Sequence, residues 1–497
     1  AANKAGLPDR IAHKYTRNGW FKVQYKLKTD QGCDDTFSRW IKIPGPRPRF
    51  EFNTKAGNEV TICVGDSLQF SNLTDSASTS ADWTWFFGDG KIDNKKDLFL
   101  YHRYDKPGKF YVFLEQYDSL IREMKARYPG ALDFRVAETP VFLPKAFKDQ
   151  MIDTCEYIID LMTETDLLKK TAVAIPNDWT IPGNEGNPDF IAFDFGVCLN
   201  EENELSPQLI ELQGFPTLFS YQILLDKLYR SHFQIDEKLS PYLSGLNELS
   251  YEELLRKTIV GDHPPQEVVL LEILPHQQKT RIDFYSTQEL LGIPVVCLTD
   301  IILHNGQLFY ERDGMTHPIR RIYNRIIFDE LEQQTEPIRA KGRLLTEATE
   351  VEWCPHPHWF YRISKFLLPY LRHPNIPATF FLNEVKQIPA DLENYVLKPL
   401  FSFAGQGVII DPTPSDLEQI PDPSNWILQR KVPYASVIPT PDDPAKVEIR
   451  IFYCWPPGAD RPIPTMNLAR ISKGKMVGTR YNKDRTWVGG SICYFES

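Results

Sequence analysis

The sequence predicts a multidomain protein in which an all-β N-terminal region precedes a larger region of mixed α and β structure. Three observations lead to this division. The chain has 497 residues, which is too long for one hydrophobic core. Up to about residue 118, apolar and polar residues alternate in short runs, as in half-buried strands. Beyond that point apolar residues recur three and four positions apart, as in SLIREMKARY, which indicates amphipathic helices.

Composition excludes several classes of partner. The net charge is −10 and the pI about 5.6, so the surface as a whole does not favour nucleic acid. No apolar run approaches the roughly 20 residues that are needed to cross a bilayer. The eight cysteines form no CxxC pair, which argues against a zinc site. We therefore expect a globular chain with no membrane span and no nucleic-acid partner.

Two segments of the N-terminal region are similar to each other. HKYTRNGWFKVQYKLKT begins at His13, and HRYDKPGKFYVFLEQ begins at His102, after WTWFFGDG at 83–90. The second segment resembles the polycystic kidney disease (PKD) domain, whose pattern is WxFGDG followed by HxYxxPGxYxV. This resemblance implies a partial repeat at 1–45 and an immunoglobulin-like β-sandwich at 46–120, used as a spacer or adhesion module and usually found outside the cell.

The stretch FIAFDFGVCLNEENELSPQLIELQGFP, residues 190–216, predicts a β-hairpin, because two apolar runs flank a polar segment. A pairing centred between Glu202 and Asn203 places Asp194 opposite Glu211. Side chains alternate along a strand, so Gln213 shares the face of Glu211. Three side-chain oxygen donors then converge.

Two facing carboxylates repel each other, and a bound cation would remove that repulsion. Magnesium prefers oxygen ligands and is commonly held by one or two carboxylates together with substrate phosphates. The hairpin therefore predicts a Mg²⁺ site. Two alternatives remain open: Asp194 and Glu211 lie on opposite faces, or they pair with nearby arginines.

A lysine and a glycine-rich loop form a second candidate site in YVLKPLFSFAGQGVIID. Gly405 and Gly407 would let backbone N–H groups approach phosphate oxygens, and Lys398 would supply a positive charge. The segment lacks the GxxxxGK[ST] pattern of the Walker loop. The alternative is a glycine hairpin beside a surface lysine.

Three strand-like segments follow this loop: WILQRKV, VEIRIFYCW and MNLARISKGKMVGTRYNKDRTWVGGS. Arg450 and Arg470 lie in the last two segments. The guanidinium fork matches phosphate oxygens, so these arginines could clamp a phosphoryl group. A solvated edge strand that carries arginines is the alternative.

Taken in order, these segments resemble the circularly permuted form of the ATP-grasp superfamily, as in glutathionylspermidine synthases, over about residues 128–497. In ordinary ATP-grasp enzymes the acidic strands follow the lysine strand, whereas here they precede it by about 190 residues. The resemblance implies an α+β or α/β ATP-grasp fold. Its first part, 121–345, would carry the acidic hairpin and a substrate subdomain, and its second part, 346–497, the lysine strand and the nucleotide loop.

The resemblance also implies residue roles. Phosphates of ATP would be bound by Lys365 of RISKFLLPYL, by Lys398 and by the loop of Gly405 and Gly407. The adenine pocket would be lined by Gln429, Lys431 and Val432. Magnesium would be held by Asp194, Glu211 and Gln213, and catalysis would depend on Arg450, Arg470 and Asn482. Gln213 departs from the family, which usually has Asn there.

The implied function is an ATP- and Mg²⁺-dependent carboxylate–amine ligase that acts through an acyl phosphate. Its partners would be a small-molecule or peptide carboxylate and an amine. One alternative keeps the fold for a kinase-like or inactive ATP-binding protein. Another assigns the main function to the PKD-like repeats, as a secreted adhesion or spacer protein.

The two regions lead to different expectations of location. The ATP requirement favours the cytoplasm for the ligase region, and the PKD-like region favours an extracellular or cell-surface setting.

Overall fold

The computed structural model describes the chain almost completely from residue 117 to residue 496. The gaps in this range are 234, 402–405, 441–442, 475–476, 478–481 and 483–484. Before residue 117, the described residues are 19–28, 34–43, 50–52, 67–72, 84–87, 91–93, 99–103, 105 and 113–115. The predicted FGDG turn at 87–90 and the loop residue Gly405 thus lie largely outside the described residues.

The chain forms two compact units. The smaller contains Ala1–Phe87, Ile92–Gly130 and Arg230–Gln234. The larger contains Gly88–Lys91, Ala131–Tyr229 and Ile235–Ser497.

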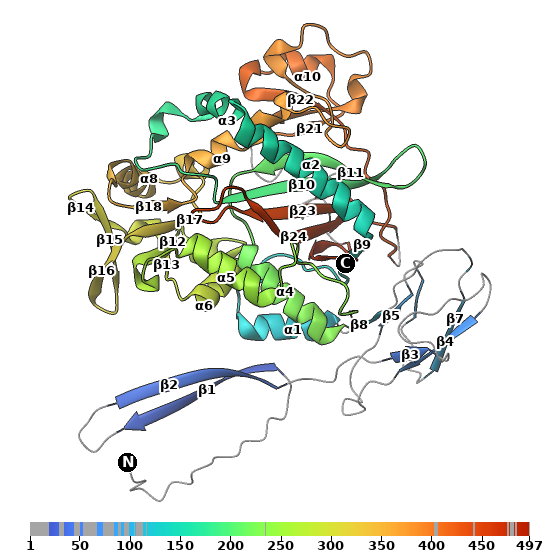
Figure 1. The fold of residues 1–497 in the computed structure, drawn as a ribbon, viewed down its shortest axis with the longest axis horizontal. Helices are drawn as coiled ribbons and strands as arrows, with labels where there is room; N and C mark the ends of the chain where they lie inside the picture. Colours follow the sequence, from blue (N-terminus) through green and yellow to red (C-terminus); the bar gives the residue numbers. More distant parts are fainter. Residues whose placement is uncertain are drawn as a thin grey trace, which may run out of the picture. The chain divides into compact units, whose positions relative to one another are not determined.

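The described strands of the smaller unit confirm the predicted all-β character of this region (Figure 1). The strands and the helix that follows them are β1 (Gly19–Lys28), β2 (Asp34–Ile43), β3 (Phe50–Phe52), β4 (Ser67–Asn72), β5 (Thr84–Phe86), β6 (Ile92–Asp93), β7 (Phe99–Arg103), β8 (Phe113–Glu115) and α1 (Tyr117–Arg127). β1 pairs with β2, and two three-stranded sheets have the orders β3-β4-β7 and β6-β5-β8. Phe70 of one sheet packs on Trp85 of the other, with ring centroids 5.7 Å apart, as expected of a sandwich core.

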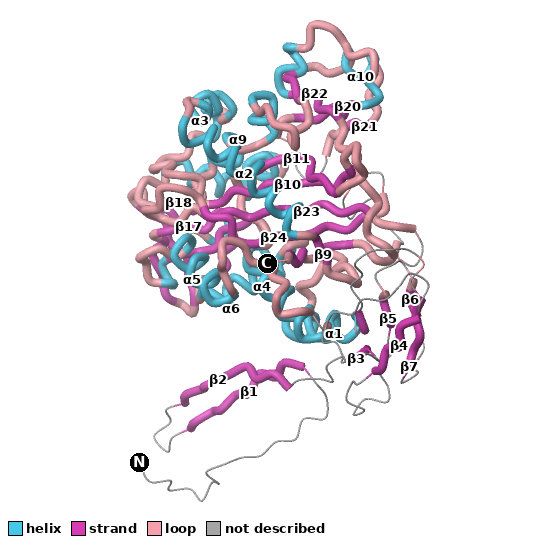
Figure 2. Tube along the Cα trace, turned by 45° about the vertical axis from the view of Figure 1, so that its right-hand side comes forward, coloured by secondary structure: helices cyan, strands magenta, loops and turns pink. Residues whose placement is uncertain are grey.

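A five-stranded antiparallel sheet lies at the centre of the larger unit, in the order β11-β10-β23-β24-β25. Its strands are β10 (Phe190–Leu199), β11 (Leu205–Gln213), β23 (Lys446–Cys454), β24 (Ile463–Ser472) and β25 (Gly489–Ser491). Helix α2 (Lys145–Glu164) packs on this sheet, and Figure 2 shows the strands running side by side.

The two faces of this sheet differ because side chains alternate along each strand. Phe193 and Phe195 of β10 pack into the core that α2 covers, together with Ile449 and Ile451 of β23. The residues between them on the strands therefore face the other side of the sheet. Asp194 and Arg450 are among these residues, so the fold places charged side chains on the face opposite α2.

A second, parallel sheet has the order β13-β12-β17-β18. Its strands are β12 (Val268–Glu272), β13 (Val295–Cys297), β17 (Arg321–Asn324) and β18 (Glu352–Cys354). Three helices that precede or connect these strands are α4 (Phe219–His232), α5 (Glu248–Ile259) and α6 (Arg281–Leu291). An antiparallel meander is inserted between β13 and β17: β14 (Ile302–His304), β15 (Gln307–Arg312) and β16 (Met315–Ile319). The mixed α/β character expected of this region is confirmed.

A third sheet, in the order β19-β22-β20-β21, forms a small lobe with its own apolar core. Its elements are β19 (Thr379–Phe381), β20 (Tyr395–Pro399), β21 (Ile409–Ile410), α10 (Pro414–Glu418) and β22 (Trp426–Arg430). Tyr395, Leu397 and Leu428 face this core. Lys398 and Gln429 alternate with them and face the other side of the lobe.

The remaining strands and helices are β9 (Val141–Leu143), which pairs with β26 (Cys493–Phe495), and α3 (Leu167–Lys170), α7 (Phe328–Glu332), α8 (Glu336–Arg343) and α9 (His358–Arg362). Among the described helices, none is both long enough and apolar enough to cross a bilayer.

Gly214, directly after β11, provides a test of how tightly the larger unit is packed. A Cβ there would lie 2.6 Å from the carbonyl oxygen of Trp359 and 2.9 Å from the Cβ of Ile363. We expect Gly214→Ala to lower the free energy of unfolding by about 1–3 kcal/mol, because backbone has to move. Urea unfolding measures this change. Gly490→Ala is the matched control, since its Cβ would meet its nearest atom at 3.6 Å, and equal effects of the two variants would contradict the packing.

Candidate functional site

Asp194 and Glu211 face each other across the hairpin, so the predicted register is confirmed. The turn, however, is not centred between Glu202 and Asn203 as predicted. Leu199 pairs with Leu205, which centres the turn on Glu202, and a β-bulge after Asp194 leaves Ile210 as the extra residue that restores the pairing. The bulge also turns the Ile210 carbonyl oxygen toward Lys398, whose Nζ donates to it at 3.3 Å.

Arg450 is the nearest cation to Asp194. Cross-strand pairing places it directly beside Asp194 on β23. Its Nε and Nη2 atoms donate to the two carboxylate oxygens at 2.5 and 2.6 Å, a bidentate pair, and Asp194 is only 1% exposed. Gln213 lies on the other side of the guanidinium. With its amide oriented so that the oxygen faces Arg450, this oxygen accepts from Nη1 at 2.5 Å and from Nη2 at 3.1 Å. Glu211 is more distant, with its Oε1 atom 4.0 Å from Nη2.

Arg470 joins Asp194 to a carboxylate that the sequence analysis did not single out. Its Nη2 donates to Asp194 at 2.8 Å and also contacts Oε1 of Glu448, which lies opposite Arg470 on β23. The hydroxyl of Tyr434 donates to the other oxygen of Glu448 at 3.2 Å. The Nε of Arg470 is buried and has no hydrogen-bond partner among the described residues. Glu448 is two residues from Arg450 on one strand, and this spacing is the sequence signal that could have identified it.

The two carboxylates that share Arg470 have opposite pKa shifts. Burial by itself raises the pKa of Asp194, but the guanidinium groups of Arg450 and Arg470 outweigh it and hold that pKa below its usual value. Burial raises the pKa of Glu448 to about 7, because Arg470 offsets burial only in part and Asp194 adds a like charge. At neutral pH the pair therefore holds Asp194 ionised and Glu448 partly protonated.

Two lysines complete the site. Lys365 begins the 3₁₀ helix η7 (Lys365–Tyr370), and its Nζ lies 3.8 Å from Oε2 of Glu211. Lys398 of β20 donates to Oε1 of Gln429 at 2.5 Å, and the Nε2 of Gln429 has no partner among the described residues. Burial lowers the pKa of Lys398 to about 8, helped by the charge of Lys365 and opposed by Glu211.

The structure thus brings together eight side chains that we call the charged cluster: Asp194, Glu211, Gln213, Lys365, Lys398, Glu448, Arg450 and Arg470. It holds three carboxylates and four cationic groups, so the cations are in excess even when every carboxylate is ionised. An excess of buried positive charge favours an anionic ligand.

The other predicted nucleotide residues are placed less directly. Gly407 has a φ of 74°, which favours glycine, and Gly405 lies outside the described residues. Val432 packs against Gly196 of β10, where an added Cβ would lie 2.7 Å from its Cγ1. Lys431 instead contacts Asp411 and the carbonyl oxygen of Glu393, on the β20–β21 side of the lobe.

Asn482, predicted to be catalytic, stabilises a turn at the end of β24. Its amide oxygen accepts from the backbone N–H of Lys473 at 2.8 Å and of Gly474 at 3.2 Å. Its amide nitrogen, Nδ2, donates to the hydroxyl of Ser472 at 2.9 Å. Through these bonds Asn482 holds the turn at 472–474, which directly follows the part of β24 that carries Arg470.

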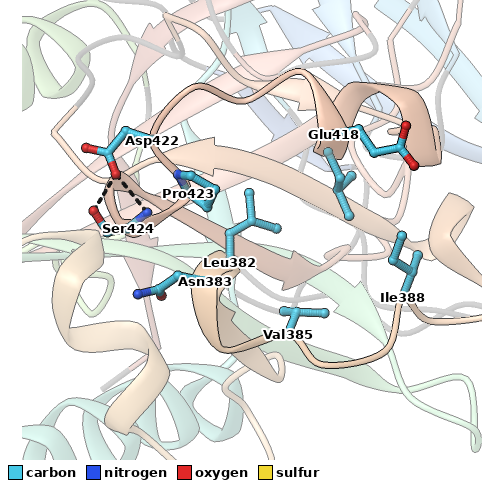
Figure 3. Close-up of a pocket in the computed structure, with 9 residues that line it drawn as sticks. Leu382, Asn383, Val385, Ile388, Glu418, Asp422, Pro423 and Ser424 are labelled. Carbon is cyan, nitrogen blue, oxygen red and sulfur yellow. Dashed lines mark hydrogen bonds between the residues drawn. The ribbon is translucent and has the colours of Figure 1, made fainter.

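A hollow in the small lobe lies apart from the charged cluster. Its volume is about 510 Å³, and Figure 3 shows Leu382, Val385 and Ile388 lining it with Asp422 and Glu418 at the rim. Leu382 packs in the lobe core with Leu397 and Leu428, which face away from Lys398 and Gln429. The hollow is therefore on the opposite face of the lobe from the predicted adenine residues.

The side chains at the acidic hairpin are chemically suited to a divalent ion. Asp194, Glu211 and Gln213 offer oxygen donors of the kind that magnesium prefers, and a cation, the Arg450 guanidinium, already lies among them. No group of three or more His, Cys, Asp and Glu side chains in the described part of the chain has the arrangement of a metal site. Substrate phosphates would therefore have to complete the coordination. The alternative of arginine pairing, left open by the sequence, describes the observed contacts of Asp194.

Comparisons with known proteins bear mainly on the N-terminal region. Residues 51–120 match the PKD domain family, which confirms the resemblance of the second segment, while the partial repeat at 1–45 remains a prediction. No curated protein matches the chain. Among solved structures, a glutathione synthetase-like effector from Globodera pallida, in its apo form, aligns with 76% of this chain and 96% of its own length, at 8% identity and a TM-score of 0.45. A likeness at that score carries no argument about fold or function.

The buried pair at Asp194 predicts a large loss of stability when the carboxylate is removed. We expect Asp194→Ala to lower the free energy of unfolding by about 3–5 kcal/mol, because Arg450 would remain buried without its bidentate partner and Arg470 would keep only Glu448. Asp391→Ala is the control: Asp391 pairs with Arg430 at 3.4 Å on the surface, where loss of the pair should cost about 0–1 kcal/mol. Denaturant unfolding of both variants measures the difference, and a small effect at Asp194 would argue against the pairing.

Glu448 predicts a pH dependence of stability. Its pKa is raised from 4.5 to about 7 on folding, so the folded state binds this proton more tightly. The stabilisation is present below pH 4.5 and is lost as the pH rises through about 7. We expect wild-type protein to lose stability relative to Glu448→Gln over this window. Unfolding midpoints measured at a series of pH values test it, and parallel curves for the two proteins would refute it.

Proposed function

We propose that the larger unit is an ATP- and Mg²⁺-dependent ligase that activates a carboxylate as an acyl phosphate and joins it to an amine, with ADP and phosphate as products. One observation supports this proposal above all. Four cationic side chains from η7, β20, β23 and β24 gather at the acidic hairpin, although the hairpin and Lys398 are about 190 residues apart in the chain. Such a cluster suits a triphosphate and the negative charge that moves during phosphoryl transfer.

The geometry suggests a division of roles among the cations. Lys398 and Lys365 would bind phosphate oxygens as point charges. The Nε of Arg470 has no partner among the residues that the structure describes, so it can donate to an anion while Nη2 keeps Asp194. Arg450 uses both ends of its fork on Asp194 and Gln213, which makes it a residue that positions the acidic hairpin.

Asp194, Glu211 and Gln213 would hold the magnesium ion, which neutralises phosphate charge and orients the phosphates when bound. Gln429 would bind the base of the nucleotide, because its Nε2 is a buried donor with no partner among the described residues. Val432 would form an apolar wall beside Gly196. The order of these elements, with acidic strands ahead of the lysine strand, is the order proposed for a circularly permuted ATP-grasp fold.

A second candidate function rests on the smaller unit. The PKD match at residues 51–120 favours a spacer or adhesion role for this part of the chain. The two functions are compatible in one protein. We propose a cytoplasmic setting for the ligase, because it consumes ATP, and the PKD match favours the cell surface; fractionation of native cells would show where the chain resides.

The reaction itself predicts which compounds ADP release requires. With ATP, Mg²⁺, pooled amino acids and dipeptides as carboxylates, and pooled polyamines as amines, we expect ADP only when both pools are present. ADP release without the amine would favour the kinase-like alternative. The absence of both ADP release and ATP binding would overturn the proposed function.

Lys398 provides the matched variant for this assay. We expect Lys398→Met to lower the rate of ADP release about 100-fold, a typical loss when one group that stabilises developing charge is removed. Lys386→Met, at an exposed position of the same lobe, should leave the rate unchanged. Equal rates for the two variants would contradict the role of Lys398.

A further inference from the structure

Arg325 is a buried arginine that the charged cluster does not use. It directly follows β17, is 5% exposed, and its Nε and Nη1 atoms have no hydrogen-bond partner in the described part of the chain. Leaving a buried donor unpaired costs about 1–3 kcal/mol, and more for a charged group. A ligand that supplies acceptor oxygens would remove this cost.

Two phenylalanines fix the plane of this guanidinium. The central carbon of Arg325 lies 5.1 Å from the ring centre of Phe215 and 5.4 Å from that of Phe284. Both contacts are of the cation–π type, which holds the group in place without using its N–H donors. The guanidinium of Arg325 is therefore held in place while its Nε and Nη1 donors stay available.

Two polar groups beside this arginine also have buried atoms that lack partners in the part of the chain that the structure describes. Asp283, close enough to Arg325 to affect its charge balance, accepts from the backbone N–H of Tyr221 at 3.0 Å with one oxygen, and its Oδ2 has no partner among the described residues. The hydroxyl of Ser220, on the first turn of α4 and next to the backbone that Asp283 contacts, also has no partner among the described residues. The arrangement combines donors on Arg325 with acceptors on its neighbours.

Burial shifts the pKa values of the acids around Arg325 upward, and none of these acids forms an ion pair with it in the described part of the chain. Burial raises the pKa of Glu272 to about 8, with Arg325 opposing the shift. Burial also raises the pKa values of Asp283 and Glu330. No carboxylate oxygen of the described residues lies within 4.0 Å of the guanidinium nitrogens in an ion pair. The Nε and Nη1 donors thus remain available to a ligand in this part of the structure.

The position of Arg325 connects it to the proposed active site. It follows β17, and β12 and β17 run parallel, so Arg325 lies where their carboxyl ends meet, the edge at which open α/β sheets bind ligands. Phe215, which stacks on Arg325, is two residues after Gln213, which contacts Arg450. Two residues span at most about 7 Å, so the charged cluster and Arg325 flank one short segment.

We propose that Arg325 anchors a second anion site, which binds a carboxylate of an amino acid or peptide, while Asp283 accepts a hydrogen bond from its amino group. That the ligand is the ligase substrate rests on the proposed function. The site itself does not, since it stands on atoms of Arg325 and Asp283 that have no partner among the described residues.

The test uses the full chain with sodium acetate and glycine as probes, observed by saturation-transfer NMR. We expect both probes to bind wild-type protein, and glycine to bind more tightly because it also offers an ammonium group. Arg325→Met should weaken both about 10- to 100-fold, the range that corresponds to loss of a charged hydrogen bond. Arg312→Met, at an exposed position of β15, should bind them as wild type does.

Two further variants separate this inference from the proposed function. Lys398→Met should lose ATP affinity, measured by calorimetry, and keep acetate binding, whereas Arg325→Met should show the reverse. Arg325→Lys keeps the charge and loses the fork, so it should bind acetate with intermediate affinity, and it replaces Arg325→Met in the test if that variant does not fold. Acetate and glycine that fail to bind wild type, or that bind the Arg325 variants equally well, would overturn the second site.

Discussion

The bidentate pair between Asp194 and Arg450 is the interaction on which the geometry of the larger unit depends. Both side chains are buried, and separating two buried charges leaves each with its full desolvation penalty. The pair forms only when β10 and β23 are in one register. A slip by one residue would turn Asp194 into the apolar core of Phe193 and Phe195, and would bring a phenylalanine to the polar face. The same register then places Arg470 and Glu448 within reach of Asp194.

The hairpin and its facing carboxylates could be predicted from the sequence, because strand periodicity is local and the turn lies between the two partners. The prediction of Asp194 opposite Glu211 was correct, although the centring that led to it was half a residue off. The β-bulge at Ile210 adds one unpaired residue to β11, and this residue brings Glu211 opposite Asp194. Bulges leave no trace in a pattern of apolar and polar residues, so this compensation was beyond sequence reasoning. The carbonyl that the bulge frees for Lys398 was equally invisible.

Contacts between distant strands were the part that the sequence could not provide. The sequence indicates Arg450 as a phosphate-binding candidate, yet nothing in VEIRIFYCW shows that its strand pairs with β10, some 250 residues earlier. Glu448 is not evident from the sequence for the same reason, since its importance comes from its contact with Arg470 on the next strand. For Lys431 and Asn482, a motif in the expected order does not determine what the side chain contacts. Their motifs fitted the expected order, but their side chains satisfy nearby groups of the loop and turn.

The occupied donors of the arginines decide which of them can meet a ligand. A guanidinium has five N–H groups, and Arg450 directs donors from all three of its nitrogens to Asp194 and Gln213. These contacts use four of the five N–H groups, so only one, on Nη1, is left for an anion. Arg470 is more exposed, and within the described ranges its Nε has no partner. Over the same ranges Arg325 has two donors without partners, at the far end of the segment from Gln213 to Phe215. The stiff pair at Arg450 therefore holds the acidic hairpin in place, while the arginines on either side of it keep the donors that a phosphate and a carboxylate need.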